Sequence, residues 1–480
     1  MVARATRLAG SARGADGLDA AFAAIRAEHE VPEEFPAEVL EAAERAARDP
    51  RLPETDARHL ELVTIDPPGA MDLDQAMQLE RTTQGYRVHY AIADLTAFVA
   101  PGDPIDLEAH RRGQTIYCPD SRVPLHPPAL SEGAASLLPG EDRPAYVWEI
   151  ELDAEGARRS ARVYRAMVRS RARFTYEEAQ EGIDSADERF ALLAEIGLLR
   201  IERESARGGA SLPMPEQEVH ADEEGRYSLR LRPLLAAEEL NAQISLLTGI
   251  AAAQIMIEGG LGILRTMPPA DPEDLARFRR EARALGAEWP EGLPYGDFLR
   301  GLDREDPHHL AVIYEATSLF RGSGYTVLDT EDPAFSVPEN PVQAAIAAPY
   351  AHTTAPLRRL VDRFSLAVCE ALCSGSEVPA WVREGLEPLP ATMAESGRRA
   401  GAVERACLDA VEAAVLAHRV GEVFDAVVVD AGRSGLELQL TDPAVTARAE
   451  GEAEPGDRVR AELVTADLAE RSVRFRVLSS

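Results

Sequence analysis

Three closely spaced aspartates constrain this chain more than any other feature of its sequence. Asp66, Asp72 and Asp74 fall within nine residues, in the stretch TIDPPGAMDLDQAM, which follows an apolar run and contains a Pro-Pro-Gly turn. In extended backbone the side chains of Asp72 and Asp74 leave the same face, and the turn lets Asp66 fold back towards them. Such carboxylates repel one another unless a hard cation such as Mg²⁺ neutralises them. An acidic turn that only faces solvent is the alternative interpretation.

The charge balance limits how the chain can bind nucleic acid. The 480 residues carry a net charge of −31, which argues against a broad basic surface. The sequence contains no lysine, so its 51 lysine-plus-arginine residues are all arginines, and a local arginine-lined channel remains compatible with the acidic total. There is no run of about 18 apolar residues and no signal-peptide pattern, and the four cysteines fit a reducing compartment. We therefore expect a cytoplasmic protein that does not bind membranes.

The pattern along the chain divides it into three parts. Residues 1–55 contain two predicted helices, 17–29 and 37–48, which form a possible helix-turn-helix but are expected to dock on the main body. Residues 56–415 begin with strands, including the run 89–94 as the hairpin partner of the acidic segment, and continue with helices. Residues 416–480 contain five short β-like runs joined by Gly, Pro and Asp turns, which predict an OB-type barrel, at 423–431, 435–441, 445–450, 458–467 and 472–478.

One segment concentrates positive charge. Residues 156–174 carry seven arginines among apolar residues, and Arg169, Arg171 and Arg173 alternate along the chain. Alternation places these three side chains on one face of a strand. The face either meets solvent or forms a wall that binds phosphates, and both interpretations stay open.

Several separate motifs together resemble the catalytic RNB domain of the ribonuclease II family. Five segments match in the family's order: TIDPPGAMDLDQA, HYAIADLTAFVAPGDPID, GQTIYCPDSRVPLHPPALSEGAASLLPGEDRPAY, RARFTYEEAQ and YAHTTAPLRRLVDR. The resemblance runs from about residue 55 to 415, and the family also ends in an OB-type barrel. It implies an α+β fold, with a mixed α/β RNB domain, a short helical N-terminal segment and an all-β C-terminal barrel.

The resemblance also implies an activity and its catalytic residues. Members of this family are Mg²⁺-dependent 3′-to-5′ exoribonucleases that hydrolyse single-stranded RNA to nucleoside 5′-monophosphates. By this resemblance Asp66, Asp72 and Asp74 hold the metal, and Arg358 contacts the scissile phosphate. Arg358 is expected near the start of a helix opened by Pro356, where an anion is favoured. Glu404 matches a family glutamate near the catalytic arginine.

Other residues are assigned to the substrate by the same resemblance. Tyr117 matches an aromatic that stacks on the terminal nucleotide, and Tyr176 matches a tyrosine beside the sugar, where the 2′-hydroxyl identifies RNA. The substrate-binding set is completed by Gln75, Arg359 and Gln243. Gln243 matches a family glutamate near the ribose. The expected partner is the 3′ end of single-stranded RNA, and the protein is expected to be a monomer.

One departure from the family pattern supports a different interpretation. Gln75 stands where the family has a fourth aspartate, and a neutral amide is a poorer ligand for a hard cation. The chain is then either an active enzyme with a weakened metal position or a non-catalytic RNA-binding relative. A phosphatase of the haloacid-dehalogenase type also has an Asp-x-Asp motif, but there the motif directly ends an apolar strand, whereas Asp72 follows Pro-Pro-Gly-Ala-Met.

Overall fold

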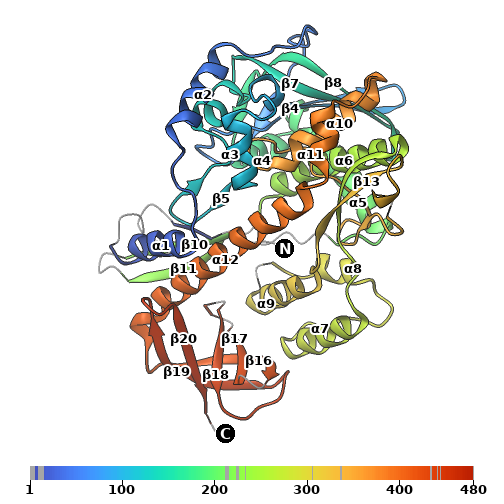
Figure 1. Cartoon of the computed structure of the whole chain (residues 1–480). Coiled ribbons are helices and arrows are strands. Elements are labelled where there is room, and N and C mark those ends of the chain that lie inside the picture. Colours follow the sequence, from blue (N-terminus) through green and yellow to red (C-terminus); the bar gives the residue numbers. More distant parts are fainter. Residues whose placement is uncertain are drawn as a thin grey trace.

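A large mixed α/β body and a small β-barrel make up the molecule, with helices linking them. The computed structural model describes residues 6–8, 16–210, 216–222, 226–232, 234–304, 306–335, 338–432, 435–440, 442–443 and 445–478. Figure 1 shows the body at one end, the barrel at the other, and the long helix α12 (Leu389–Leu416) running between them. The predicted mixed fold with N-terminal helices and a C-terminal five-stranded barrel is confirmed.

A six-stranded sheet forms the centre of the body. Its strand order is β8-β7-β4-β3-β2-β9. The predicted hairpin is present, because β3 pairs antiparallel with β4 from Gln75 opposite Ile92 onwards. The second half of β4 is buried on both faces, as expected for a central strand that reads as a continuous apolar run. The six strands are β2 Val63–Ile65, β3 Gln75–Thr82, β4 Gly85–Ala93, β7 Asp142–Leu152, β8 Arg158–Arg169 and β9 Ala172–Phe174.

The two faces of the sheet pack against different groups of residues. On one face Met77, Tyr90 and Ile92 join a large core with helix α6 (Ala236–Gly259). On the other face Ala76, Ala91 and Ala93 pack in a second core. The larger core also takes residues from α4 Tyr176–Asp184, α5 Glu188–Ala206 and α10 Leu360–Ser374.

Helix α6 is apolar around most of its circumference. Among the described residues it alone is long and apolar enough, by length and composition, to cross a membrane. However, 67% of its most apolar stretch is buried inside the protein. A helix that is hydrophobic all round is typical of a protein core as well as of a membrane span.

The arginine-rich segment does not form one continuous strand. Strand β8 ends at Arg169 and β9 begins at Ala172. Arg169 pairs with Asp142 at 2.7 Å, and Arg171 pairs with Glu61 at 3.1 Å. Arg173 donates to the backbone carbonyl of Ala70 at 2.8 Å and so holds the acidic turn. Local acceptors thus bind all three arginines, and a wall that binds phosphates stays a prediction.

The helix expected from Pro356 onwards begins later in the structure. Helix α10 starts at Leu360, and Arg359 before it has extended backbone. Backbone hydrogen bonds explain the difference, since Thr115 N–H donates to the Arg358 carbonyl at 2.9 Å and Leu360 N–H donates to the Gly113 carbonyl at 3.0 Å. The segment that carries Arg358 is thus a loop held by backbone hydrogen bonds to residues 113–115. The prediction that Arg358 lies inside a helix is wrong.

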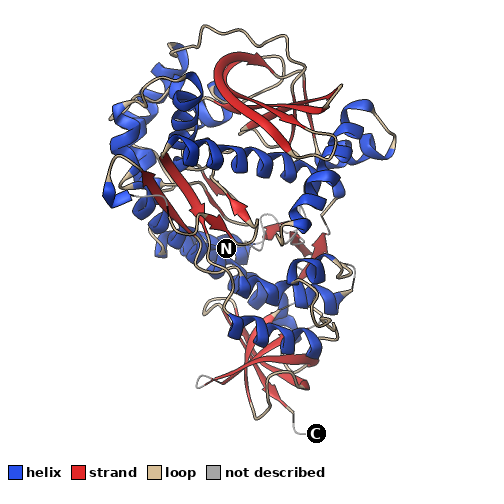
Figure 2. Ribbon diagram, turned by 90° about the vertical axis from the view of Figure 1, so that its right-hand side faces the viewer, coloured by secondary structure: helices blue, strands red, loops and turns tan. Residues whose placement is uncertain are grey.

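The C-terminal barrel follows its predicted strands closely. It closes in the order β16-β17-β18-β20-β19. Three helices beside it, α7 Pro272–Ala284, α8 Tyr295–Arg300 and α9 Pro307–Ala316, share a core with Val427 of the barrel. Figure 2 shows the curved sheet and the barrel at opposite ends, with helices between them. The barrel strands are β16 Val423–Gly432, β17 Gly435–Leu440, β18 Thr446–Glu450, β19 Arg458–Asp467 and β20 Ser472–Val477.

The two N-terminal helices dock on the body as expected. They are α1 Asp16–Glu28 and α2 Ala37–Arg48. Residues of α1 share a core with α12 and with a short hairpin formed by β5 Ile116–Tyr117 and β6 Arg122–Val123. Arg26 of α1 reaches the turn of that hairpin, where its Nη1 donates to both carboxylate oxygens of Asp120 at 3.0 and 2.9 Å.

The contact between α1 and the hairpin generates a stability prediction. Arg26 is almost fully buried and also pairs with Glu33 at 2.8 Å, so Arg26→Ala leaves Asp120 without its guanidinium partner. We expect a loss of about 1–3 kcal/mol in the free energy of unfolding, measured by urea denaturation. The matched control is Arg45→Ala, which removes an exposed arginine on α2 paired with Glu41 at 3.8 Å. Exposed ion pairs contribute little to stability. Equal losses of unfolding free energy in the two variants would therefore contradict a stabilising role of the buried Arg26–Asp120 pair.

Candidate active site

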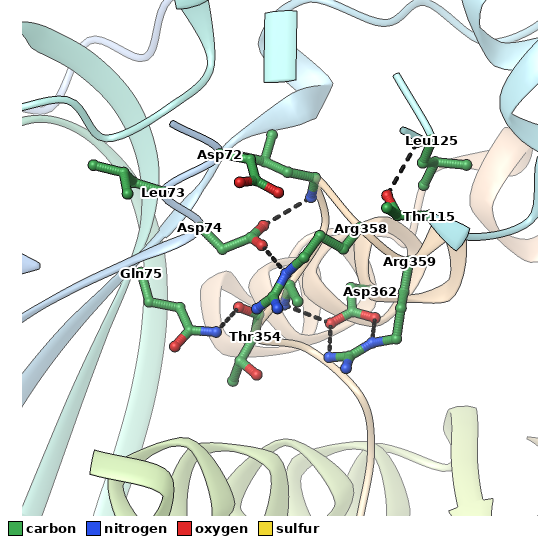
Figure 3. A network of polar contacts seen from close by, with 12 residues as sticks. Asp72, Leu73, Asp74, Gln75, Thr115, Leu125, Thr354, Arg358, Arg359 and Asp362 are labelled. Atoms are coloured by element: carbon green, nitrogen blue, oxygen red, sulfur yellow. Dashed lines mark hydrogen bonds and ion pairs between the residues drawn. The ribbon is translucent and has the colours of Figure 1, made fainter. Parts of the chain in front are cut away.

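Asp74 joins two distant parts of the chain. Its side chain is only 2% exposed. One carboxylate oxygen accepts a hydrogen bond from the Leu357 backbone N–H at 2.8 Å, and the other accepts from Arg358 Nε at 2.7 Å (Figure 3). Burial raises the pKa of Asp74 to about 7, against the opposing effects of Arg358 and the Leu357 N–H. The two ends of this contact are 284 residues apart.

Asp72 is held by a different arginine. Arg122 Nη1 donates to Asp72 Oδ1 at 2.5 Å, and Arg122 Nη2 binds Glu132 at 2.8 Å. Arg122 lies on β6, directly opposite Tyr117 on β5. The ion pair therefore links the acidic segment to the hairpin that carries Tyr117.

Asp66 has a buried oxygen that no hydrogen bond satisfies. Among the described residues, Asp66 Oδ2 has no hydrogen-bond partner. Burial raises the pKa of Asp66 to about 6, and the Asp72 carboxylate adds to this, while the Thr64 hydroxyl and Arg358 act in the opposite direction. A buried carboxylate oxygen without a donor is costly unless a cation compensates it.

The site fits a divalent cation in its residue types. Arg358 interacts electrostatically with Asp66, Asp72 and Asp74, so all three aspartates lie within electrostatic range of one guanidinium. Within the part of the chain that the structure describes, no group of three or more His, Cys, Asp or Glu side chains is arranged as ligands. Arginines neutralise Asp72 and Asp74, whereas Asp66 Oδ2 has no hydrogen-bond partner in the described part of the chain. Hard carboxylate oxygens of this kind suit Mg²⁺.

Arg359 is used differently from its neighbour Arg358. Its Nε and Nη2 bind both oxygens of the fully buried Asp362, each at 2.8 Å. Asp362 Oδ1 also accepts from the Ala355 N–H at 2.7 Å. A bidentate pair of this type fixes the geometry of the loop. In the structure Arg359 therefore organises the loop that carries Arg358, and its predicted contact with substrate stays a prediction.

Gln75 does not direct its amide towards Asp72. Its Nε2 donates to the Thr354 carbonyl at 2.6 Å, as Figure 3 shows. Its Oε1 accepts from the hydroxyl of the buried Tyr90 at 2.5 Å. Both polar ends of the side chain therefore contact protein groups, and none of these contacts is to an aspartate.

The two predicted substrate tyrosines come from different elements, β5 and α4. Tyr117 is 52% exposed on its hairpin, although it is aromatic and large. Tyr176 is the first residue of α4, whose start is fixed by a capping box between Thr175 and Glu178. Burial raises the pKa of Tyr176 to about 12, with a further contribution from Asp66 and an opposing hydrogen bond with Asn241. Tyr176 thus lies close to both Asp66 and helix α6.

Gln243 is buried and bound to a residue of α5, and its predicted role at the ribose stays a prediction. Gln243 is 3% exposed, and its Nε2 donates to the buried Glu204 of α5 at 3.1 Å. The residues of α6 that interact with the site are Glu238, Asn241 and Ser245. Their spacing of three and four residues is that of one helix face, and Gln243 lies off this face. In the sequence, this periodicity is the signal that Asn241 and Ser245 share the helix face directed towards the site.

Glu404 is half-buried on helix α12. Helix α12 also contacts β5, the strand of Tyr117. The role of Glu404 near the catalytic arginine stays a prediction.

Comparison with known protein families identifies the class of this chain. Residues 54–372 match the RNB domain, and residues 422–478 match the RNase II-type exonuclease C-terminal S1 domain. The chain belongs to the RNB family of ribonuclease II and R type.

Individual relatives are distant. The chain is 27% identical over 513 residues to ribonuclease R of Escherichia coli, a match that covers 94% of this chain and 61% of that protein. The chain thus spans about three fifths of the length of such a relative. Its fold is similar to that of ribonuclease R from Mycoplasma genitalium, with a TM-score of 0.83 at 18% identity, covering 96% of this chain and 78% of the other. It is also similar to yeast Ssd1, described as a pseudonuclease, with a TM-score of 0.67 at 14% identity, covering 93% and 57%.

The raised pKa of Asp66 generates a prediction for the metal-free protein. The ordinary value is 3.8 and the folded value is about 6, so the folded state favours protonation. This contribution to stability is complete below about pH 4 and is lost as the pH rises through 6. We expect Asp66 to lower the free energy of unfolding over this range by less than the about 1.4 kcal/mol per pH unit that one full proton gives. Asp74, whose pKa is also raised, adds to the fall in the parent, so Asp66→Asn should reduce the slope without abolishing it. Urea unfolding at pH 4–7 with a chelator measures it.

The exposed Asp184→Asn is the control for removal of one carboxylate. It should leave the slope of stability against pH close to that of the parent. A parent slope that Asp66→Asn does not change would contradict the assignment of the shift to Asp66.

Proposed function

We propose that the chain is a Mg²⁺-dependent 3′-to-5′ exoribonuclease that hydrolyses single-stranded RNA to nucleoside 5′-monophosphates. The observation that supports it best is that Asp66, Asp72 and Asp74 all interact electrostatically with Arg358, while a buried Asp66 oxygen has no hydrogen-bond donor among the described residues. The three aspartates would hold the metal. When bound, Mg²⁺ supplies an activated water and stabilises charge on the leaving oxygen.

The protein groups around the metal site suit a phosphodiester. Arg358 is 39% exposed although Asp74 binds its Nε, so a phosphate can approach the guanidinium. A guanidinium binds phosphate well because it is planar and stays charged. The exposed ring of Tyr117 offers a surface for stacking on a base. Tyr176, beside Asp66 and Asn241, is available to contact the sugar.

The proposed partner is the 3′ end of single-stranded RNA. Support comes from the ribonuclease R of Mycoplasma genitalium, whose fold the chain shares and which has been solved with ribose-methylated single-stranded RNA. The barrel's two aromatics, Phe424 and Phe475, pack edge-to-face in its core with ring centres 5.6 Å apart. Because these rings are buried, RNA binding by the barrel would depend on its charged and polar groups. A division into segments 1–55, 56–415 and 416–480 is part of the proposal.

A non-catalytic RNA-binding protein is the second candidate. Two observations favour it: Gln75 replaces a fourth aspartate, and Asp72 and Asp74 are paired with arginines. The fold of the yeast pseudonuclease Ssd1 shows that this architecture occurs in a protein so described. An enzyme differs from such a binder in its Mg²⁺-dependent release of nucleotides.

The proposed function is tested with RNA labelled at either end, with and without Mg²⁺. A 3′ label should appear at once as a mononucleotide, while a 5′ label should shorten stepwise. Asp74→Asn should abolish release and leave RNA affinity within severalfold, because affinity comes from phosphate contacts along several nucleotides. Binding without release by the parent would favour the second candidate. A variant that keeps most of the Mg²⁺-dependent rate would show that the acidic cluster is not the catalytic centre.

Tyr117→Ala should lengthen the final product and leave the chemical step intact. As RNA shortens it loses backbone contacts, and stacking of about 1–3 kcal/mol per base becomes its main remaining contact. The measurement is the length of the limit product on a homopolymer. Tyr164→Ala is a control on the distant strand β8, where the tyrosine is half-buried. Unchanged product length in Tyr117→Ala would exclude the stacking role.

A further inference from the structure

Gln75 belongs to a closed ring of hydrogen bonds behind the acidic cluster. Its Nε2 donates to the Thr354 carbonyl, and its Oε1 accepts from Tyr90. The Tyr90 hydroxyl lies 3.4 Å from Ser245 Oγ, and Ser245 Oγ donates to Thr354 Oγ1 at 3.0 Å. Four separate elements meet in this ring: strand β3, strand β4, helix α6 and the loop that leads to Arg358.

The ring requires an amide at position 75. The Thr354 carbonyl can only accept a hydrogen bond, so the group facing it must be a donor. A carboxylate has no donor, and aspartate is also one methylene shorter than glutamine. An aspartate at position 75 would therefore leave the Thr354 carbonyl without this donor, although Thr354 is almost fully buried.

Gln75 and Asp74 hold the same loop from opposite faces of the sheet. Successive side chains of extended backbone alternate between faces. Asp74 binds Leu357 N–H and Arg358 Nε, and Leu357 packs in the same core as Ala76 and Ala93. The ring of Gln75 lies on the other side, where Tyr90 packs with residues of α6. Two adjacent residues thus fix the loop at its Thr354 end and at its Arg358 end.

We propose that Gln75 is a positioning residue that holds the 354–358 loop, and with it Arg358, in place through the Thr354 carbonyl. The inference rests on the proposed function for the role of Arg358 in hydrolysis. It differs from the interpretation of Gln75 as a weak metal ligand. A ligand would place an oxygen towards Asp72 and Asp74, whereas the Gln75 oxygen binds Tyr90 and its nitrogen binds Thr354.

The contact itself is tested without any activity measurement. Gln75→Glu keeps the length and the acceptor for Tyr90 but replaces the donor that faces Thr354 with an oxygen. Hydrogen–deuterium exchange of peptides covering 351–360 reports on the loop, because the amides of Ala355 and Leu357 are bound by Asp362 and Asp74. These amides should exchange at least about threefold faster in Gln75→Glu.

The control for added charge is Gln84→Glu. Gln84 is exposed in the turn between β3 and β4, where its Oε1 accepts from Arg159. A glutamate at position 84 keeps the acceptor for Arg159. In Gln84→Glu the hydrogen–deuterium exchange of peptides covering 351–360 should equal that of the parent. Equal exchange in the parent, Gln75→Glu and Gln84→Glu would overturn the proposal.

The link to catalysis is tested by a double-mutant cycle on the single-turnover rate of nucleotide release. Gln75→Glu should lower the rate at least about tenfold with RNA affinity within severalfold, and Arg358→Ala should lower it further. If Gln75 acts through Arg358, adding Gln75→Glu to Arg358→Ala changes the residual rate less than about twofold. Independent, multiplying effects would show that Gln75 does not act through Arg358.

Calorimetric titration of Mg²⁺ into the RNA-free protein distinguishes a metal-ligand role of Gln75 from its proposed positioning role. As a positioning residue, Gln75 can become Glu or Asp without tighter metal binding. Tighter Mg²⁺ binding and a lower Mg²⁺ requirement in Gln75→Asp would overturn the proposal in favour of a ligand. If the parent releases no nucleotide, the proposed function fails, while the exchange experiment still decides whether Gln75 holds the loop.

Discussion

The contact of Asp74 with Leu357 and Arg358 is the interaction on which the rest of the site depends. It connects the start of β3 to a loop 284 residues later, through one backbone and one side-chain donor. Because Asp74 is almost fully buried, neither donor can be replaced by water at low cost. The sheet that carries the acids and the loop that carries the arginine are therefore assembled together, and the proposed catalytic groups come together only in the complete fold.

Arginines neutralise the aspartates that are clustered at the candidate site. Each of two active-site aspartates has its own guanidinium, Arg122 for Asp72 and Arg358 for Asp74, and Asp362 nearby has Arg359. Buried carboxylates without partners would be strongly destabilising. The arginines thus allow acids to be concentrated in one place before any cation binds. Asp66 lacks such a partner on Oδ2 among the described residues, which is consistent with its role in the proposed metal site.

The features that the sequence predicted are those set by local patterns. The barrel strands, the hairpin of β3 with β4 and the two N-terminal helices agree with the structure to within a few residues, because alternation and turn residues act over short distances. The loop before α10 was missed because its backbone is tied to residues 113–115, far away in the sequence. Gln243 lies off the helix face shared by Asn241 and Ser245, a placement that matching one glutamine to a family glutamate does not take into account. Partners of side chains, such as Thr354 for Gln75, follow from tertiary contacts that no local pattern encodes.

The first N-terminal helix also supports the hairpin beside the acidic cluster. The hairpin of β5 and β6 carries the exposed Tyr117 and, directly opposite it, Arg122, which binds Asp72. Arg26 of α1 binds Asp120 in the turn of this hairpin, so the first helix supports the position of both residues. A hairpin with strands of only two residues would be marginal by itself. Ion pairs therefore hold the hairpin of Tyr117 from both sides, one to the N-terminal helix and one to the acidic cluster.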